Sequence, residues 1–192
     1  MARPRDPRRR TEILDAVIEQ LAETGIAGLS LRPLAQALGH STRVLTHHFA
    51  DKDDLITAVL ERLDEIQHGQ LRATEGWDDT SCGIGALVRD SWRRHLEPEN
   101  LGATRLVHEI EGLAAAGRLG GRVPKFLADR ADFVAGALQA RGLAPDAARV
   151  HATFLNSAYA GLQADLLVTG DRARTEAALT ELCELADSWT RR

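Results

Sequence analysis

Apolar residues recur along this 192-residue chain at intervals of three and four positions, the spacing that gathers them on one face of a helix. The first such stripe lies near the N-terminus and consists of Ile13, Leu14, Val17 and Leu21. Gly25 follows it and can end a helix in the left-handed conformation. The pattern therefore predicts a first helix over residues 8–24.

Capping residues and helix breakers divide the rest of the chain. Ser30, Asp51 and Asp146 are expected N-caps, and Pro98 and Pro124 are expected in the first turns of helices. These signals predict further helices over residues 30–38, 42–49, 51–72, 81–96, 98–117, 124–140, 146–169 and 170–189. Because Ala and Leu are frequent and β-branched runs are scarce, we expect an all-α fold of about nine helices.

Composition narrows the class of protein. Aromatic residues make up only 4% of the chain, so aliphatic side chains and alanine must fill the core. No apolar run approaches the roughly 20 residues that span a bilayer, and no apolar stretch follows the basic N-terminus as in a signal peptide. Cys82 and Cys183 are far apart and match no metal-ligand spacing. We therefore expect a cytoplasmic protein with reduced cysteines and no membrane partner.

Residues 31–50, LRPLAQALGHSTRVLTHHFA, have the spacing of a helix-turn-helix. Ala35 is small enough for two helices to cross closely, Gly39 can adopt the positive φ of a tight turn, and Leu45 can bury against the first helix. The small core of this motif is completed by Leu34, Leu38, Val44 and Phe49. A generic helical hairpin can share this spacing, so the motif alone leaves both interpretations open.

Residues 8–60 also resemble the DNA-binding domain of the TetR family of regulators. The resemblance rests on three segments: ILDAVIEQLAETGIAGLSLRPLA, the turn ALGHS, and the block HHFADKDDLITAVL. In that block the family pattern is matched by His48, Phe49, Lys52, Asp53 and Asp54. Two positions depart from the pattern: Thr46 stands where the family usually has a phosphate-contacting Tyr, and His40 replaces a small aliphatic residue.

Positive charge is concentrated near the N-terminus. Residues 1–52 carry eight Lys and Arg against six Asp and Glu, whereas residues 53–192 carry sixteen against twenty-two. Because DNA repels an acidic body, we expect docking by the N-terminal end. The resemblance implies a DNA-binding domain over residues 1–50, with a basic arm over 1–10, and a ligand-binding and dimerisation domain over 51–192.

A recognition helix lays its exposed residues along the major groove of DNA. The exposed positions of helix 42–49 are expected to be Thr42, Arg43, Thr46 and His47. Arg43 is the candidate for a base contact, because a guanidinium can bind guanine in bidentate fashion; a phosphate contact is the alternative. Backbone phosphate contacts are expected from Arg8, the amides of Ser30 and Leu31, and Lys52, which resembles the family's phosphate-binding lysine.

A short recognition helix reads few base pairs, so we expect a homodimer on palindromic double-stranded operator DNA. The last two predicted helices carry apolar stripes, and the resemblance implies that they form the dimer interface; intramolecular packing is the alternative. The candidate interface residues are Phe154, Leu155, Ala158, Leu162, Leu166, Leu179, Leu182 and Leu185.

The resemblance further implies a pocket for a small-molecule effector among the middle helices. The candidate lining residues combine aromatic, apolar and polar side chains that could orient a small molecule. They are Trp92, His95, Leu96, Arg105, His108, Glu109, Phe126, Phe133, Asn156 and Tyr159. For each of them, a role in packing alone is the alternative.

These features together predict a ligand-responsive transcriptional regulator, a repressor that its effector releases from DNA, with activation as the alternative. An α-helical enzyme and a helical interaction adaptor are the competing classes. The sequence has no nucleophile–base motif, phosphate-binding glycine loop or metal-ligand spacing, and His95, His108 and His151 fall on separate predicted helices. We therefore expect no catalytic residue, no metal and no cofactor.

Overall fold

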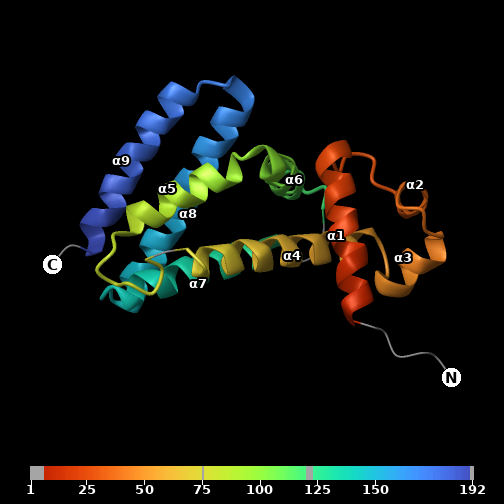
Figure 1. The fold of residues 1–192 in the computed structure, drawn as a ribbon, viewed down its shortest axis with the longest axis horizontal. Coiled ribbons are helices and arrows are strands. Elements are labelled where there is room, and N and C mark those ends of the chain that lie inside the picture. The colour runs from red at the N-terminus through yellow and green to blue at the C-terminus, as the bar shows by residue number, and fades with distance from the viewer. Residues whose placement is uncertain (1–6, 75, 120–122, 191–192) are drawn as a thin grey trace. The chain divides into compact units, whose positions relative to one another are not determined.

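The structure, a computed structural model, describes residues 7–74, 76–119 and 123–190. Within these ranges there are helices and no strands (Figure 1). The helices are α1 (Pro7–Thr24), α2 (Leu31–Ala37), α3 (Thr42–His48), α4 (Lys52–Arg72), α5 (Ile84–His95), α6 (Pro98–Ala115), α7 (Val123–Ala140), α8 (Pro145–Thr169) and α9 (Arg172–Thr190). The all-α prediction is confirmed. Arg3 and Arg5 of the expected basic arm lie outside the described residues.

Local hydrogen bonds explain where several helices begin. Asp51 caps α4 as predicted, since its Oδ1 accepts the Asp54 N–H at 2.8 Å. The predicted start of α5 at residue 81 is wrong, because Asp79 accepts both the N–H and the hydroxyl of Ser81, at 2.9 and 2.6 Å, and holds that residue in a turn. The predicted cap Asp146 instead lies in the first turn of α8, which begins at Pro145.

The chain folds into two compact units, which we call the head unit (Met1–Glu65 and Pro98–Pro124) and the body unit (Ile66–Glu97 and Lys125–Arg192). This division differs from the boundary expected after residue 50. The first part of α4 and the whole of α6 belong to the head unit.

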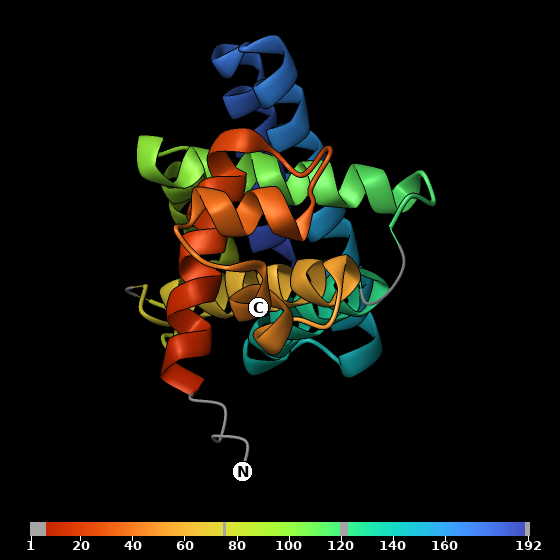
Figure 2. The ribbon, with the colours of Figure 1, turned by 90° about the vertical axis from the view of Figure 1, so that its right-hand side faces the viewer.

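Within the head unit, α2 and α3 lie beside α1, as Figures 1 and 2 both show. Helix α6 packs against α1, where Gly102 approaches Ala22 so closely that an added Cβ would lie 3.0 Å from the alanine Cβ. A second contact is made by Glu109 of α6, whose carboxylate accepts the backbone N–H groups of Ile26 and Ala27 at 2.9 and 2.8 Å. These contacts tie α6 to α1 and to the loop between α1 and α2.

Within the body unit, α9 packs against both α5 and α8. The α8–α9 connection turns at Gly170, which ends α8 in the left-handed conformation, and Asp171 Oδ1 then accepts the Arg174 N–H at 3.1 Å. The buried guanidinium of Arg141 organises the segment before α5. It donates to the backbone carbonyls of Gly76, Trp77, Asp79, Cys82 and Ala137 at 3.0 to 3.3 Å.

Among the described residues, no helix combines the length and the apolar character that crossing a bilayer requires.

Candidate functional site

The helix-turn-helix is built from α2 and α3 of the head unit. Ala35 and Leu45 are fully buried where the two helices meet, and Phe49 closes the same core. The turn between the helices depends on Gly39, whose φ is +67°, a conformation that side-chain-bearing residues rarely adopt. The sequence-based prediction of the glycine's conformation and of these three core residues is confirmed.

One face of α3 is directed to solvent. Arg43, Thr46 and His47 are exposed and Thr42 is half-buried, while Leu45 points inward. The Thr46 hydroxyl donates to the Thr42 carbonyl oxygen at 3.1 Å, so its oxygen remains available as an acceptor. The four side chains predicted for the recognition surface therefore lie on one short helix with at least partial access to solvent.

The residues predicted to contact phosphates all lie in the head unit. Ser30 occupies the N-cap position of α2 without a side-chain cap bond, and Leu31 begins that helix. Lys52, half-buried, begins α4 directly after the motif, and Arg8 is exposed in the first turns of α1. Arg10 has a different environment, because its guanidinium carbon lies 5.2 Å from the ring centre of Phe49.

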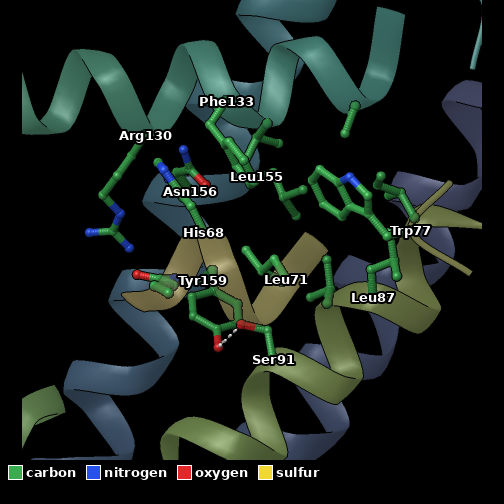
Figure 3. Close-up of a pocket in the computed structure, with 15 residues that line it drawn as sticks. His68, Leu71, Trp77, Leu87, Ser91, Arg130, Phe133, Leu155, Asn156 and Tyr159 are labelled. Atoms are coloured by element: carbon green, nitrogen blue, oxygen red, sulfur yellow. Dashed lines mark hydrogen bonds between the residues drawn. The ribbon is translucent and has the colours of Figure 1, made fainter. Parts of the chain in front are cut away.

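A cavity of about 70 Å³, partly open to solvent, lies within the body unit (Figure 3). Its walls come from the last turns of α4, the segment before α5, and helices α5, α7 and α8. The apolar lining residues are Leu71, Trp77, Ile84, Leu87, Val88, Phe133, Val134, Ala137 and Leu155. The polar lining residues are Gln67, His68, Ser91, Arg130, Asn156 and Tyr159.

Three rings are stacked along one side of the cavity. The Phe133 ring lies 3.7 Å from the His68 ring and 5.0 Å from the Trp77 ring, with interplanar angles of 9° and 18°. Burial, together with the positive charges of Arg72 and Arg130, lowers the pKa of His68 to about 4, and these effects outweigh the raising effect of Asp129. His68 is therefore neutral at pH 7 and suited to aromatic stacking.

Polar groups occupy other parts of the lining. The Tyr159 hydroxyl lies 3.3 Å from Ser91 Oγ and 3.0 Å from His95 Nδ1, and burial raises the pKa of this phenol. The phenol is thus a neutral hydrogen-bonding group. Asn156 differs, because its buried Nδ2 has no hydrogen-bond partner among the described residues.

The residues predicted to line a ligand pocket divide into three groups. Phe133, Asn156 and Tyr159 line the cavity. Trp92, His95, Leu96 and Phe126 lie in the body unit outside its lining. Arg105, His108 and Glu109 lie on α6 in the head unit, where Glu109 binds backbone amides.

Sequence reasoning missed the contributions of His68, Trp77 and Arg130 to the cavity. His68 lies near the end of a helix that is partly polar, and Trp77 lies in a loop, so neither sequence context indicates a cavity. The packing of α4 against α7 brings these side chains together.

The residues predicted for the dimer interface differ in how far they are buried within the single chain. Leu155, Leu166, Leu179 and Leu182 are buried within the body unit and pack intramolecularly. Ala158 and Leu162 are partly buried against the same core. The exposed large apolar residues of α8 and α9 are Val150, Phe154, Val168 and Leu185.

Comparisons with known proteins agree with this architecture. Residues 13–59 match the family described as bacterial regulatory proteins, tetR family. The HTH-type transcriptional regulator BetI of Burkholderia thailandensis is 34% identical over 101 residues, covering 44% of this chain and 51% of BetI. The chain spans between 28% and 51% of the length of the BetI proteins that it matches.

Solved structures resemble the chain over most of its length. The multidrug binding protein EbrR, complexed with malachite green, has a TM-score of 0.69 and 29% identity, covering 94% of this chain and 99% of EbrR. A TetR-family member from Streptomyces coelicolor A3 has a TM-score of 0.72 and 27% identity, covering 92% of this chain and 99% of that protein.

The head unit therefore carries a helix-turn-helix, a motif that in its class places a helix in the major groove of DNA, and the body unit is helical. Over residues 13–59 the chain is thus similar to the tetR family of bacterial regulatory proteins, and its fold resembles that of a solved TetR-family member over 92% of this chain.

Proposed function

We propose that the chain is a ligand-responsive transcriptional repressor that binds palindromic operator DNA as a homodimer and is released by a small-molecule effector. The observation that carries this proposal is the solvent-directed face of α3. Arg43, Thr46 and His47 project from a helix whose opposite side is anchored by the fully buried Leu45. This arrangement suits a helix that enters the major groove.

DNA recognition is divided between bases and phosphates. Arg43 contacts a guanine O6 and N7, which gives sequence selectivity. Arg8, Lys52 and the amides of Ser30 and Leu31 bind phosphates and fix the orientation of the head unit on the duplex.

The homodimer is proposed to form through the exposed apolar residues of α8 and α9. Phe154 and Leu185 are 49% and 44% exposed in the single chain, although both are large and apolar. Pairing of these faces in two chains makes a four-helix bundle and removes the apolar surface from water.

Helix α4 provides the link between effector and DNA. It is continuous from Lys52 to Arg72, so its first turn follows the recognition helix and its last turns carry His68 and Leu71 into the cavity lining. An effector that binds one position of α4 more tightly than another shifts the dimer toward a state with lower DNA affinity. EbrR, a structural neighbour described as a multidrug binding protein and crystallised with ethidium and with malachite green, supports a small-molecule ligand for this chain.

The test is a fluorescence-anisotropy titration of the full chain with the duplex upstream of its own gene, at two salt concentrations, against a scrambled duplex. We expect selective binding with two chains per site. Arg43→Ala should lower specific affinity by about 1–3 kcal/mol, which is roughly five- to 150-fold, and leave non-specific binding nearly unchanged.

Arg172→Gln is the matched control, because Arg172 is exposed on α9 and pairs only with Glu176 in the described contacts. Equal, salt-sensitive binding to both duplexes, followed by a random-sequence selection that enriches no site, would refute the proposal.

A further inference from the structure

We propose that the body-unit cavity selects a planar aromatic carboxylate and discriminates against organic cations of the same size. This inference rests on the proposed function and adds to it the chemical class of the effector. Three features of the lining carry it: the sign of its charge, an unpaired hydrogen-bond donor, and a stack of flat rings.

The charged lining favours an anion. Arg130 lines the cavity, and none of the lining residues that the structure describes is a carboxylate. The nearby carboxylate of Asp129 is paired with Lys125. Arg72 adds a second positive charge, since its guanidinium carbon lies 4.9 Å from the centre of the Phe133 ring. A cation that entered would be desolvated beside like charges, whereas an anion would gain an attractive partner.

The low pKa of His68 also indicates that the electrostatic potential in the cavity is positive. Arg72 and Arg130 both act against protonation of this imidazole and outweigh the opposing effect of Asp129. The same two arginines would repel a ligand cation placed near His68. The imidazole stays neutral at pH 7, so it adds a ring face to the cavity and no charge.

The unpaired donor is Asn156 Nδ2, which is buried and has no partner within the described part of the chain. A buried amide N–H without an acceptor is destabilising, and a ligand oxygen would satisfy it. Figure 3 shows Asn156 and Arg130 drawn on the same side of the cavity, opposite Trp77. A carboxylate has two oxygens and can accept from both residues, whereas an amidinium has only donors and can satisfy neither.

The rings determine the shape of the ligand. His68, Phe133 and Trp77 present nearly parallel faces, and a planar ring system can join such a stack. The cavity of about 70 Å³ is smaller than the roughly 150 Å³ that encloses a benzene molecule, so the ligand enters only if lining side chains move. His68 and Leu71 belong to α4, so their displacement acts on the helix that leads to the DNA-binding motif.

The experiment uses isothermal titration calorimetry of the full chain with three probes of equal shape: 2-naphthoate, 2-naphthamide and 2-naphthamidinium. These carry charges of −1, 0 and +1 on one planar ring system. We expect naphthoate to bind at least about tenfold more tightly than naphthamidinium, with naphthamide between them, because charge-assisted hydrogen bonds exceed neutral ones.

Two variants localise the effect to the cavity. Arg130→Gln should weaken naphthoate binding by about ten- to a hundredfold and leave naphthamide within about threefold. Asn156→Leu should weaken both naphthoate and naphthamide without lowering the melting temperature, because it removes a buried donor that has no partner. Arg172→Gln, with the same change of net charge at an exposed site, should alter none of the affinities.

The inference is overturned if naphthamidinium binds as tightly as naphthoate, if the preference survives in Arg130→Gln, or if naphthoate does not bind up to about 1 mM. Operator binding is measured in parallel on the same preparations. Retained selective DNA binding in any of these cases leaves the regulator function standing and rejects only the effector class, whereas absent DNA binding counts against the proposed function itself.

Discussion

Glu109 offers the sharpest test of how α6 supports the head unit. Its two carboxylate oxygens accept the backbone N–H groups of Ile26 and Ala27, at 2.9 and 2.8 Å, in the loop that leads to α2. Glu109→Ala removes both acceptors. The Ile26 residue is only 1% exposed, so its N–H cannot readily turn to water, whereas the exposed Ala27 amide can be solvated.

The expected cost follows from this difference. A charge-assisted hydrogen bond to a part-buried donor contributes about 2 kcal/mol, and one to an exposed donor less than about 1 kcal/mol. Glu109→Ala should therefore lower the free energy of unfolding by about 2–3 kcal/mol, equivalent to about 5–10 °C in melting temperature for a chain of this length. Glu109→Gln keeps one acceptor but turns an NH2 group toward the other donor, so it should cost about 1–2 kcal/mol.

Thermal and urea unfolding followed by circular dichroism measures these changes. Glu19→Ala, which removes a carboxylate from an exposed position of α1, is the control and should stay within about 0.5 kcal/mol of the parent chain. If Glu109→Ala melts with the control but alters the response to effector, the loop contact is unimportant and the sequence-based assignment of Glu109 to the ligand pocket is restored.

Three further predictions concern the body unit. Arg141→Met should lower stability by about 3 kcal/mol in urea unfolding, because five backbone carbonyls lose their buried donor, and a melting curve unchanged from the parent would contradict this. His68 stays neutral in the folded chain down to about pH 4 but gains a proton near pH 6.5 when unfolded, so stability falls as pH drops through that window. His68→Phe should remove about 1 kcal/mol of this loss at pH 5, after allowance for the half-exposed ring; parallel pH–stability curves would reject the idea. Phe154→Arg combined with Leu185→Arg should yield a folded monomer by light scattering, while Leu127→Arg, at a similarly exposed site on α7, should leave the dimer intact.

Local chemistry in the sequence was sufficient to predict most of the secondary structure and the helix-turn-helix motif. The spacing of apolar residues predicted α1, and the small Ala35 with the turn glycine Gly39 predicted the helix-turn-helix. Asp51 predicted the start of α4. These features can be predicted from the sequence because each depends on the conformation of a single residue or on residues within one or two helical turns of it. The error at the start of α5 arose where a turn hydrogen bond to Asp79 competed with helix formation.

The contacts between helices distant in the chain were decided by the tertiary structure alone. Glu109 has the same chemistry whether it faces a ligand or a backbone amide, and only the packing of α6 on α1 brings it to Ile26. Likewise, the cavity exists because α4 supplies His68 to a stack with Phe133 of α7, although nothing in either segment predicts the other. Helical periodicity shows that a face is apolar, but it does not show which surface will cover it. The sequence therefore determined the helices and the helix-turn-helix motif, and the packing determined which side chains surround the cavity and which remain exposed.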